Sequence, residues 1–168
     1  MALSSSQKGR IVEQLIGASL LLGSDGRLRV SLPLVDDEGV DLIVGDKDSD
    51  TPILLQIKSR FSLSKRDRYR AEVRKASFRV SDRRYILFVY YDQAKGEIGD
   101  DMWLVPAAML ASRLSGQKGA RSKFIFDSSF RSKKDMWTDL HISKKDLAEK
   151  VRQLSRIERE TDEHANDY

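Results

Sequence analysis

One short run limits the fold of this chain more than any other feature of its sequence. Residues 85–91 read Tyr-Ile-Leu-Phe-Val-Tyr-Tyr and are almost wholly apolar and aromatic. A strand of this composition is expected where a sheet is buried on both faces, because neither face then carries alternating polar side chains. The run therefore predicts a strand inside a sheet that other elements cover on both sides.

The residues before this run predict a helix and three strands. The serines at positions 4–6 can cap a helix that ends at Gly23. Its apolar positions follow the helical period, and they are Ile11, Leu15, Ala18 and Leu22, with Val12, Ile16 and Ser19 beside them. Alternating or apolar runs predict strands over residues 27–35, 40–44 and 53–59. Polar turns join these strands, so we expect an antiparallel meander.

The rest of the chain predicts further helices and strands. Strands are expected over residues 85–91, 102–105 and 123–126. Helices are expected over residues 69–78, over residues 106–114 with Pro106 at the first position, and from Ser143 towards Glu158, with Asp146 placed as in a capping box. The main order, α-β-β-β-α-β-β-α with mixed pairing, predicts an α/β fold in which a mixed β-sheet is flanked by helices.

The composition fits one soluble domain, which we expect over residues 1–157, with an acidic, frayed tail over residues 158–168. Apolar residues make up 40% of the chain and charged residues 33%. No apolar run approaches the roughly 20 residues that span a bilayer, so no membrane is expected. The N-terminus lacks the basic-then-apolar order of a secretory signal. The absence of cysteine excludes disulfides and thiolate metal sites, which fits a cytoplasmic protein.

The charge of the chain is concentrated in one segment. The formal net charge is +4, but residues 60–84 carry ten basic and three acidic side chains, a net of +7. A basic segment in an otherwise balanced fold indicates a polyanionic partner. The alternative is a solvated surface with no partner.

Four polar residues interrupt the apolar pattern of the first helix and strands. Glu13 lies at the margin of the apolar stripe of the helix, where it can face the sheet. Asp41 interrupts the second strand. Gln56 and Lys58 interrupt the third, and they project from one face because strand side chains alternate. If the two strands pair as a hairpin, Asp41 lies beside Gln56 when the register places both on one face.

These side chains have the chemistry of a hard-cation site. Polar groups in buried strands are costly unless they are satisfied. Two carboxylates, an amide oxygen and a backbone carbonyl can bind Mg²⁺, which prefers oxygen ligands and usually keeps water and phosphate in its shell. The ammonium of Lys58 can orient a water molecule and stabilise charge that develops on a phosphate.

The same stretches resemble the PD-(D/E)XK nuclease superfamily, which includes restriction enzymes, Holliday junction resolvases and some homing endonucleases. They are Lys8-Gly9-Arg10-Ile11-Val12-Glu13, Gly39-Val40-Asp41-Leu42 and Gln56-Ile57-Lys58. The Lys-Gly-x-x-x-Glu helix is most similar to the Holliday junction resolvase branch, and certain homing and restriction nucleases carry Gln in the third motif. The resemblance implies a restriction endonuclease-like fold, Mg²⁺ or Mn²⁺ bound by Glu13, Asp41 and Gln56, and a catalytic role for all three and for Lys58.

Two positions depart from the usual pattern of the superfamily. No proline precedes Asp41, and Gln56 stands where Asp or Glu is usual. The amide oxygen of Gln56 can ligate a metal but adds no charge.

The resemblance implies a metal-dependent DNA endonuclease, either structure-selective or of a restriction or homing type. The DNA contacts expected are Lys8, Arg60, Lys65, Arg66, Arg68 and Arg70. Cutting both strands of a duplex needs two active sites, so a homodimer is expected. The sequence leaves two alternative functions open. One is an inactive DNA-binding or assembly module of the same fold, supported by Gln56, and the other is a protein that binds no nucleic acid.

Overall fold

The computed structural model describes residues 3–34, 39–117 and 122–156. The helices are α1 (Ser5–Gly23), α2 (Ala107–Arg113) and α3 (Leu147–Arg156), with short 3-10 turns η1 (Thr138–Leu140) and η2 (Lys144–Asp146). The strands are β1 (Leu28–Ser31), β2 (Leu42–Asp46), β3 (Ile53–Arg60), β4 (Arg68–Arg74), β5 (Arg84–Asp92), β6 (Glu97–Pro106), β7 (Lys123–Ser129) and β8 (His141–Ser143). The predicted tail at residues 158–168 lies outside the described residues.

A six-stranded mixed sheet forms the middle of the molecule. Its order is β1-β2-β3-β5-β6-β8, and β4 and β7 form a separate two-stranded antiparallel sheet. The pair β3–β5 is parallel, while the other neighbours in the large sheet pair antiparallel. The expected meander is therefore present as β1-β2-β3, and β5 lies beside β3.

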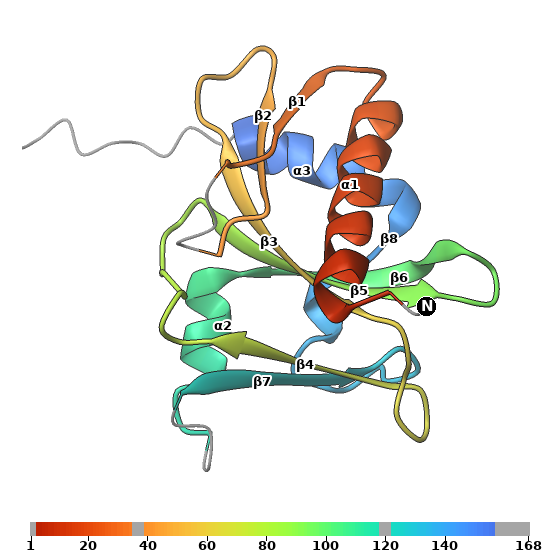
Figure 1. Ribbon diagram of the computed structural model, residues 1–168. Helices are drawn as coiled ribbons and strands as arrows, with labels where there is room; N and C mark the ends of the chain where they lie inside the picture. Colours follow the sequence, from red (N-terminus) through yellow and green to blue (C-terminus); the bar gives the residue numbers. More distant parts are fainter. Residues whose placement is uncertain (1–2, 35–38, 118–121, 157–168) are drawn as a thin grey trace, which may run out of the picture.

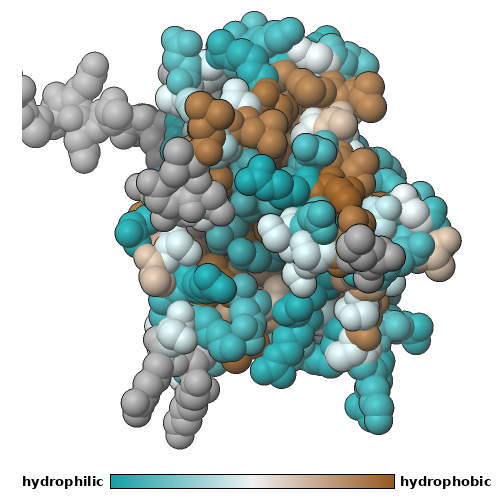
Figure 2. Space-filling model, viewed as in Figure 1, coloured by the Kyte–Doolittle hydropathy of each residue, from teal (hydrophilic) through white to brown (hydrophobic). Residues whose placement is uncertain are grey.

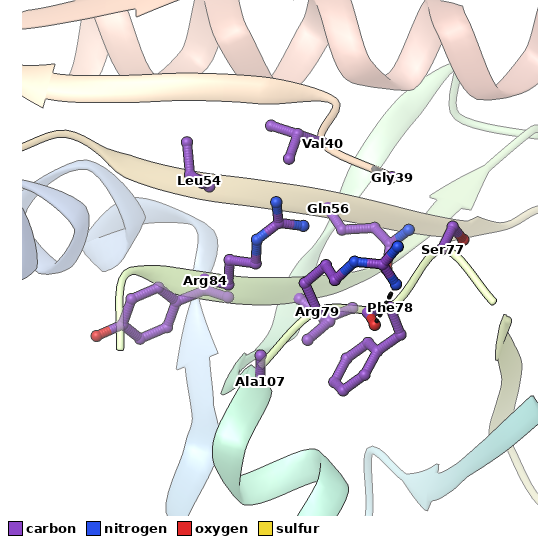
Figure 3. Close-up of a pocket in the computed structure, with 11 residues that line it drawn as sticks. Gly39, Val40, Leu54, Gln56, Ser77, Phe78, Arg79, Arg84 and Ala107 are labelled. Atoms are coloured by element: carbon purple, nitrogen blue, oxygen red, sulfur yellow. Dashed lines mark hydrogen bonds between the residues drawn. The ribbon is translucent and has the colours of Figure 1, made fainter. Parts of the chain in front are cut away.

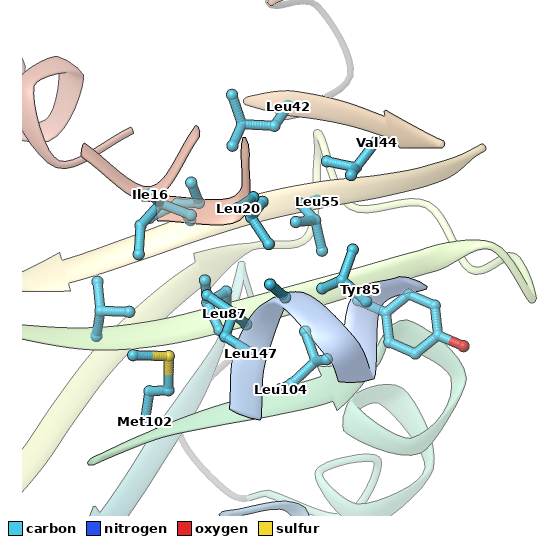
Figure 4. Close-up of a cluster of buried hydrophobic side chains, with 14 of the residues drawn as sticks. Ile16, Leu20, Leu42, Val44, Leu55, Tyr85, Leu87, Met102, Leu104 and Leu147 are labelled. Atoms are coloured by element: carbon cyan, nitrogen blue, oxygen red, sulfur yellow. The ribbon is translucent and has the colours of Figure 1, made fainter. Parts of the chain in front are cut away.

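Each face of the large sheet is covered by its own layer (Figure 1). On one face, α1 and α3 pack over a cluster that includes Leu87 of β5 (Figure 4). On the other face, β4, β7 and α2 pack over an aromatic cluster that includes Phe88, whose ring stacks on Phe126 at a centroid distance of 3.8 Å. Residues 85–89 of this run are thus buried on both faces, as the composition predicts, and Tyr90 and Tyr91 are partly buried.

The first helix begins with the expected serine cap. Ser4 accepts a hydrogen bond from the Gln7 N–H, and the Gln7 side chain accepts one from the Ser4 N–H, which completes a capping box. The buried stripe of α1 consists of Val12, Ile16 and Leu20. The other predicted stripe, with Ile11, Leu15 and Leu22, faces outward instead and is exposed.

The helix predicted over residues 69–78 is wrong, because this segment forms β4. Its burial alternates strictly, with Tyr69, Ala71 and Val73 buried and their neighbours exposed. These three side chains complete the aromatic cluster against β7, and Phe126 lies opposite Ala71 in the register. The apolar residues of this segment fit both the helical and the strand periodicity, and pairing with β7 selects the strand. The predicted order of elements is therefore wrong at β4, which carries the crossover from β3 to the parallel strand β5, and it also lacks β8, which pairs with β6.

Several predicted boundaries also change. The strand expected over 27–35 is shorter, since β1 ends at Ser31 and Leu32 is exposed. The strand expected over 102–105 is longer, because β6 forms a hairpin with β5 from Glu97. Pro106 is the N-cap of α2 and ends β6. No helix in the described part of the chain is long and apolar enough to cross a membrane.

The end of α3 is tied to the turn between β2 and β3. Arg156 donates to both carboxylate oxygens of the fully buried Asp46, at 2.7 and 3.3 Å. Ser155 accepts from the Asp46 N–H, and its carbonyl accepts from Ser49. The Asp48 N–H, and after it Arg156, hold the pKa of the Asp46 carboxyl below its ordinary value, although burial raises it. This contact holds the β2–β3 hairpin at its closed end.

We expect Asp46→Asn to lower the melting temperature by several degrees at neutral pH. Because the pKa of Asp46 is lowered in the folded state, the ionised carboxylate stabilises the fold above its ordinary pKa of about 4. That contribution is lost as the pH falls through the lower folded-state pKa. The difference in melting temperature between the variant and the wild type should therefore shrink at acidic pH, measured by circular dichroism. The exposed Asp100→Asn serves as control, and a difference independent of pH would contradict the assignment.

Candidate functional site

Asp41 stands where β2 separates from β3. Its N–H donates to the Leu55 carbonyl at 2.8 Å, and its Oδ2 accepts from the Ile57 N–H at 2.5 Å. The register pairs Leu42 with Leu55, so the next pair in the same register is Asp41 with Gln56. A backbone donor on β3 thus fixes the carboxylate at the open end of the hairpin.

Gln56 and Lys58 share the face of β3 opposite to its buried side chains. Ile53, Leu55 and Ile57 are buried, and the residues between them are partly exposed. This alternation is the one that the sequence predicts. Lys58 therefore follows Gln56 along the same face, two residues further along the strand.

A polar cleft brings the four predicted site residues together. One part of it is lined by Glu13 with Asp41 and Lys58, and a second part by Gln56 with Asp41 and Lys58. Asp41 and Lys58 belong to both parts, so they lie at the junction. The cleft runs between α1 and β4, and Figure 2 shows mostly hydrophilic side chains on the surface between these elements.

Glycines leave room beside two of the site residues. A Cβ atom at Gly39 would lie 2.5 Å from Nε2 of Gln56, and Gly39 has a φ of +66°. Its backbone conformation favours glycine, and a Cβ atom there would displace the amide end of the Gln56 side chain, which lies beside Gly39 in Figure 3. Gly9 lies one turn before Glu13, and a Cβ there would be 3.7 Å from its carboxylate. The glycines of the first two motifs therefore lie against the side chains of the site.

The backbone of Lys58 is held by a buried tyrosine. The Tyr69 hydroxyl, on β4, donates to the Lys58 carbonyl. Burial raises the pKa of Tyr69 well above its ordinary value, so the hydroxyl keeps its proton and remains a donor. The Tyr69 ring packs against Phe88 and Trp103 in the aromatic cluster. The sequence analysis missed this residue, although a tyrosine inside a buried alternation needs a partner for its hydroxyl.

A further acidic side chain, Glu72, lines the cleft from β4. Lys123 of β7 donates to it at 2.6 Å, and this bond lowers the pKa of the Glu72 carboxyl. Arg60 and Arg74 line the same part of the cleft. Glu72 was missed because this segment was expected to be a helix, which would not place it on one strand face with Arg74.

Two of the predicted DNA contacts lie at or near the cleft. Arg60 lines it at the end of β3, and its Nε donates to the Arg70 carbonyl at 2.5 Å. Lys8 is half-buried, with its ammonium 5.2 Å from the centre of the Phe61 ring. Lys8 therefore has a packing role at the end of β3.

The other four predicted contacts follow the β3–β4 turn and β4. Lys65 and Arg66 are exposed in the turn, where Arg66 has a φ of 64°. Arg68 pairs with Asp127 at 2.7 Å. Arg70 lies on the exposed face of β4. Because this segment is a strand, Arg68, Arg70 and Arg74 alternate with the buried residues and lie on its exposed face together with Glu72. We call this face of β4 the basic surface.

The oxygen donors of the cleft fit a hard divalent cation. Asp41 and Glu13 supply carboxylates, and Gln56 supplies an amide oxygen. Within the described ranges, no three His, Cys, Asp or Glu side chains gather as ligands. Mg²⁺ is commonly bound by one or two carboxylates together with water and substrate phosphates. The residues present therefore fit Mg²⁺ whose coordination a phosphate completes.

No protein-family model matches this chain. No curated protein matches it either. Among solved structures, the fold is similar to that of a bacterial homing endonuclease, I-Ssp6803I, with a TM-score of 0.53 and 19% sequence identity. The similarity covers 89% of this chain and 95% of that chain. At this identity the comparison shows the fold alone. It confirms the restriction endonuclease-like arrangement that the sequence predicts, a mixed sheet flanked by helices.

Proposed function

We propose that this chain is a metal-dependent DNA endonuclease that hydrolyses phosphodiester bonds. The observation that carries the proposal is the convergence of Glu13, Asp41, Gln56 and Lys58 on one polar cleft. The similarity to a homing endonuclease supports DNA endonuclease activity. The homing, restriction and structure-selective types all remain within this proposal.

In this proposal, Asp41, Glu13 and Gln56 hold Mg²⁺, with Mn²⁺ as a substitute. When bound there, the cation would supply Lewis-acid chemistry, lowering the pKa of a water molecule and offsetting charge on the phosphate. Asp41 is held for this role by the Ile57 N–H. Lys58 lines both parts of the cleft, and its ammonium has the charge needed to orient the water and to stabilise the developing negative charge. Glu72 stays paired with Lys123 at the wall.

The second candidate is a DNA-binding or assembly module that has lost catalysis. The neutral Gln56 favours it, because the metal then meets only two carboxylates. Both candidates use the basic surface of β4, whereas a protein without a nucleic-acid partner would not.

We also propose that the active form is a homodimer, since cutting both strands requires two active sites. Ile11, Leu15 and Leu22 expose an apolar stripe on α1, and apolar patches over this helix are visible in Figure 2. Sedimentation velocity tests the dimer, and a monomer that makes double-strand breaks would contradict it.

The decisive experiment is nicking of supercoiled plasmid with Mg²⁺ or Mn²⁺. We expect Asp41→Ala and Lys58→Ala to lower the rate by about 100- to 1,000-fold, because each removes a charge at the reacting phosphate. DNA binding and folding should remain. Asp100→Ala and Lys95→Ala, which remove the same charges from the exposed β5–β6 hairpin, serve as controls. Wild-type turnover in Asp41→Ala would exclude this site, and DNA binding without nicking by the wild type would favour the second candidate.

Gly39→Ala should weaken Mn²⁺ binding and cleavage by about 10- to 100-fold, the usual loss when a residue that orients a ligand is changed. The matched control is Gly96→Ala. Both glycines have positive φ, +66° and +70°, so both variants lose about 1–2 kcal/mol of stability. A Cβ at Gly96 meets nothing within 4 Å, whereas one at Gly39 displaces Gln56. Isothermal titration calorimetry with Mn²⁺ compares them, and equal losses in both would show that Gln56 is not a ligand.

Tyr69→Phe should lower the cleavage rate at saturating DNA while leaving DNA affinity unchanged, because Tyr69 positions Lys58 and lies inside the core. The lost hydrogen bond should cost about 1 kcal/mol of stability. Tyr90→Phe removes a hydroxyl from β5, the strand beside β3, and is the control. Single-turnover kinetics separates rate from affinity. If both variants cut at the wild-type rate, the hydroxyl has a structural role only.

A further inference from the structure

Three charged side chains line the side of the cleft next to β4, which we call the β4 wall. Arg60, Glu72 and Arg74 form this wall, opposite a floor that includes Asp41 and Lys58. All three side chains of the wall are exposed. This part of the cleft has a volume of about 670 Å³, within the range of about 300–1,000 Å³ that is usual for ligand pockets. The space therefore admits a substrate group, and the charges of the wall decide which kind.

The two arginines of the β4 wall lie towards its opposite ends. Arg60 follows Lys58 by two residues on β3, and its Nε donates to the Arg70 carbonyl at 2.5 Å. Arg74 lies four residues beyond Arg70 on β4, which is about 13 Å along an extended strand. The wall is therefore long enough to follow several nucleotides, since one DNA strand advances about 3.4 Å of helix axis per nucleotide.

The end of the wall at Arg74 is the end next to Gln56. Arg74 is the last residue of β4, and Ser77 follows it by three residues. A Cβ atom at Gly39 would lie 2.5 Å from Nε2 of Gln56 and 3.6 Å from the Ser77 carbonyl oxygen, and Figure 3 shows these residues together. Lys58, two residues beyond Gln56 on β3, therefore lies between the two arginines of the wall.

The third charge of the wall, the Glu72 carboxylate, is neutralised from the neighbouring strand. Lys123 of β7 donates to it at 2.6 Å, and this bond lowers the pKa of the Glu72 carboxyl, so the group is ionised at neutral pH. An ionised carboxylate on its own would repel a phosphate in the cleft. Paired with Lys123 it adds no net charge, and the wall keeps the two positive charges of its arginines.

We propose that Arg60 and Arg74 bind the DNA phosphates on the two sides of the cleaved one. In this arrangement, Lys123 keeps Glu72 from repelling the strand. Guanidinium groups match phosphate oxygens in bidentate geometry. The inference rests on the proposed endonuclease function and adds the path of the DNA strand, which follows the wall from Arg60 past Lys58 to Arg74. Neither Arg74 nor Lys123 was among the predicted DNA contacts.

The phosphate contacts are tested by the salt dependence of DNA binding, measured by fluorescence anisotropy on a short duplex of mixed sequence in EDTA, where no metal contributes. Each lost contact should reduce the slope of log affinity against log salt by about 0.9. We expect this reduction in Arg74→Ala and in Arg60→Ala, whereas Arg74→Lys, which keeps the charge, should retain the wild-type slope. Arg27→Ala is the control, because Arg27 is equally exposed but lies at the end of the β1–β2 ladder remote from Asp41.

The role of Lys123 is tested in the same assay by a double-mutant cycle with Glu72. Lys123→Ala should weaken duplex binding about fivefold, the effect of one uncompensated charge at short range in water. In the Glu72→Gln background no carboxylate is left to neutralise, so the same substitution should change the affinity little. Equal losses in the two backgrounds would overturn this role, because Lys123 would then act on the DNA without Glu72.

Melting curves show whether the variants fold. Arg74 is exposed, so Arg74→Ala should melt like the wild type, and it decides the test if Arg60→Ala is unstable. A wild-type slope in Arg74→Ala, or an equal fall in Arg27→Ala, overturns the phosphate contacts, while nicking that Asp41→Ala abolishes leaves the endonuclease standing. A wild-type chain that binds no duplex overturns both.

Discussion

The burial of β5 on both faces is the constraint on which the other layers depend. Leu87 faces the helices α1 and α3, and Phe88 faces β4, β7 and α2. Because neither face of this strand can meet water, the chain has to build a layer on each side. The cleft runs along the neighbouring strand β3 between these two layers. Glu13 reaches it from one layer and Glu72 from the other, so the two-sided core also brings together the walls of the site.

Elements whose apolar residues fit only the helical or only the strand periodicity could be predicted from the sequence. Elements whose apolar residues fit both could not. The capping serine and the apolar spacing of α1 have one interpretation, and so does the run at residues 85–91. In β4, Tyr69 and Val73 are spaced as on a helix, but Tyr69, Ala71 and Val73 are also spaced as on a strand. The preference for a strand comes from the partner β7, and partners distant in sequence leave no local pattern.

The same distinction applies to the site. Alternation along β3 predicts that Gln56 and Lys58 share a face, and a tight hairpin predicts that Asp41 lies near them. The residues that hold these side chains in place were not predictable in this way. Tyr69 donates a hydrogen bond to the backbone carbonyl of Lys58. Every residue has such a carbonyl, so the sequence does not indicate which one a tyrosine will contact. Gly39 is constrained by the volume of Gln56, a contact that appears only once the hairpin is closed. Its position directly after three acidic residues was the available signal.

The connection between β3 and β5 passes through the strand β4, whose residues belong alternately to the protein surface and to its core. In β4, the residues that face the cleft and the basic surface alternate one by one with those packed in the aromatic cluster. An insertion or deletion of a single residue would therefore turn Arg70, Glu72 and Arg74 inward and Ala71 and Val73 outward. We therefore expect length changes to be tolerated in the turns at the two ends of β4, and the strand itself to tolerate substitutions only.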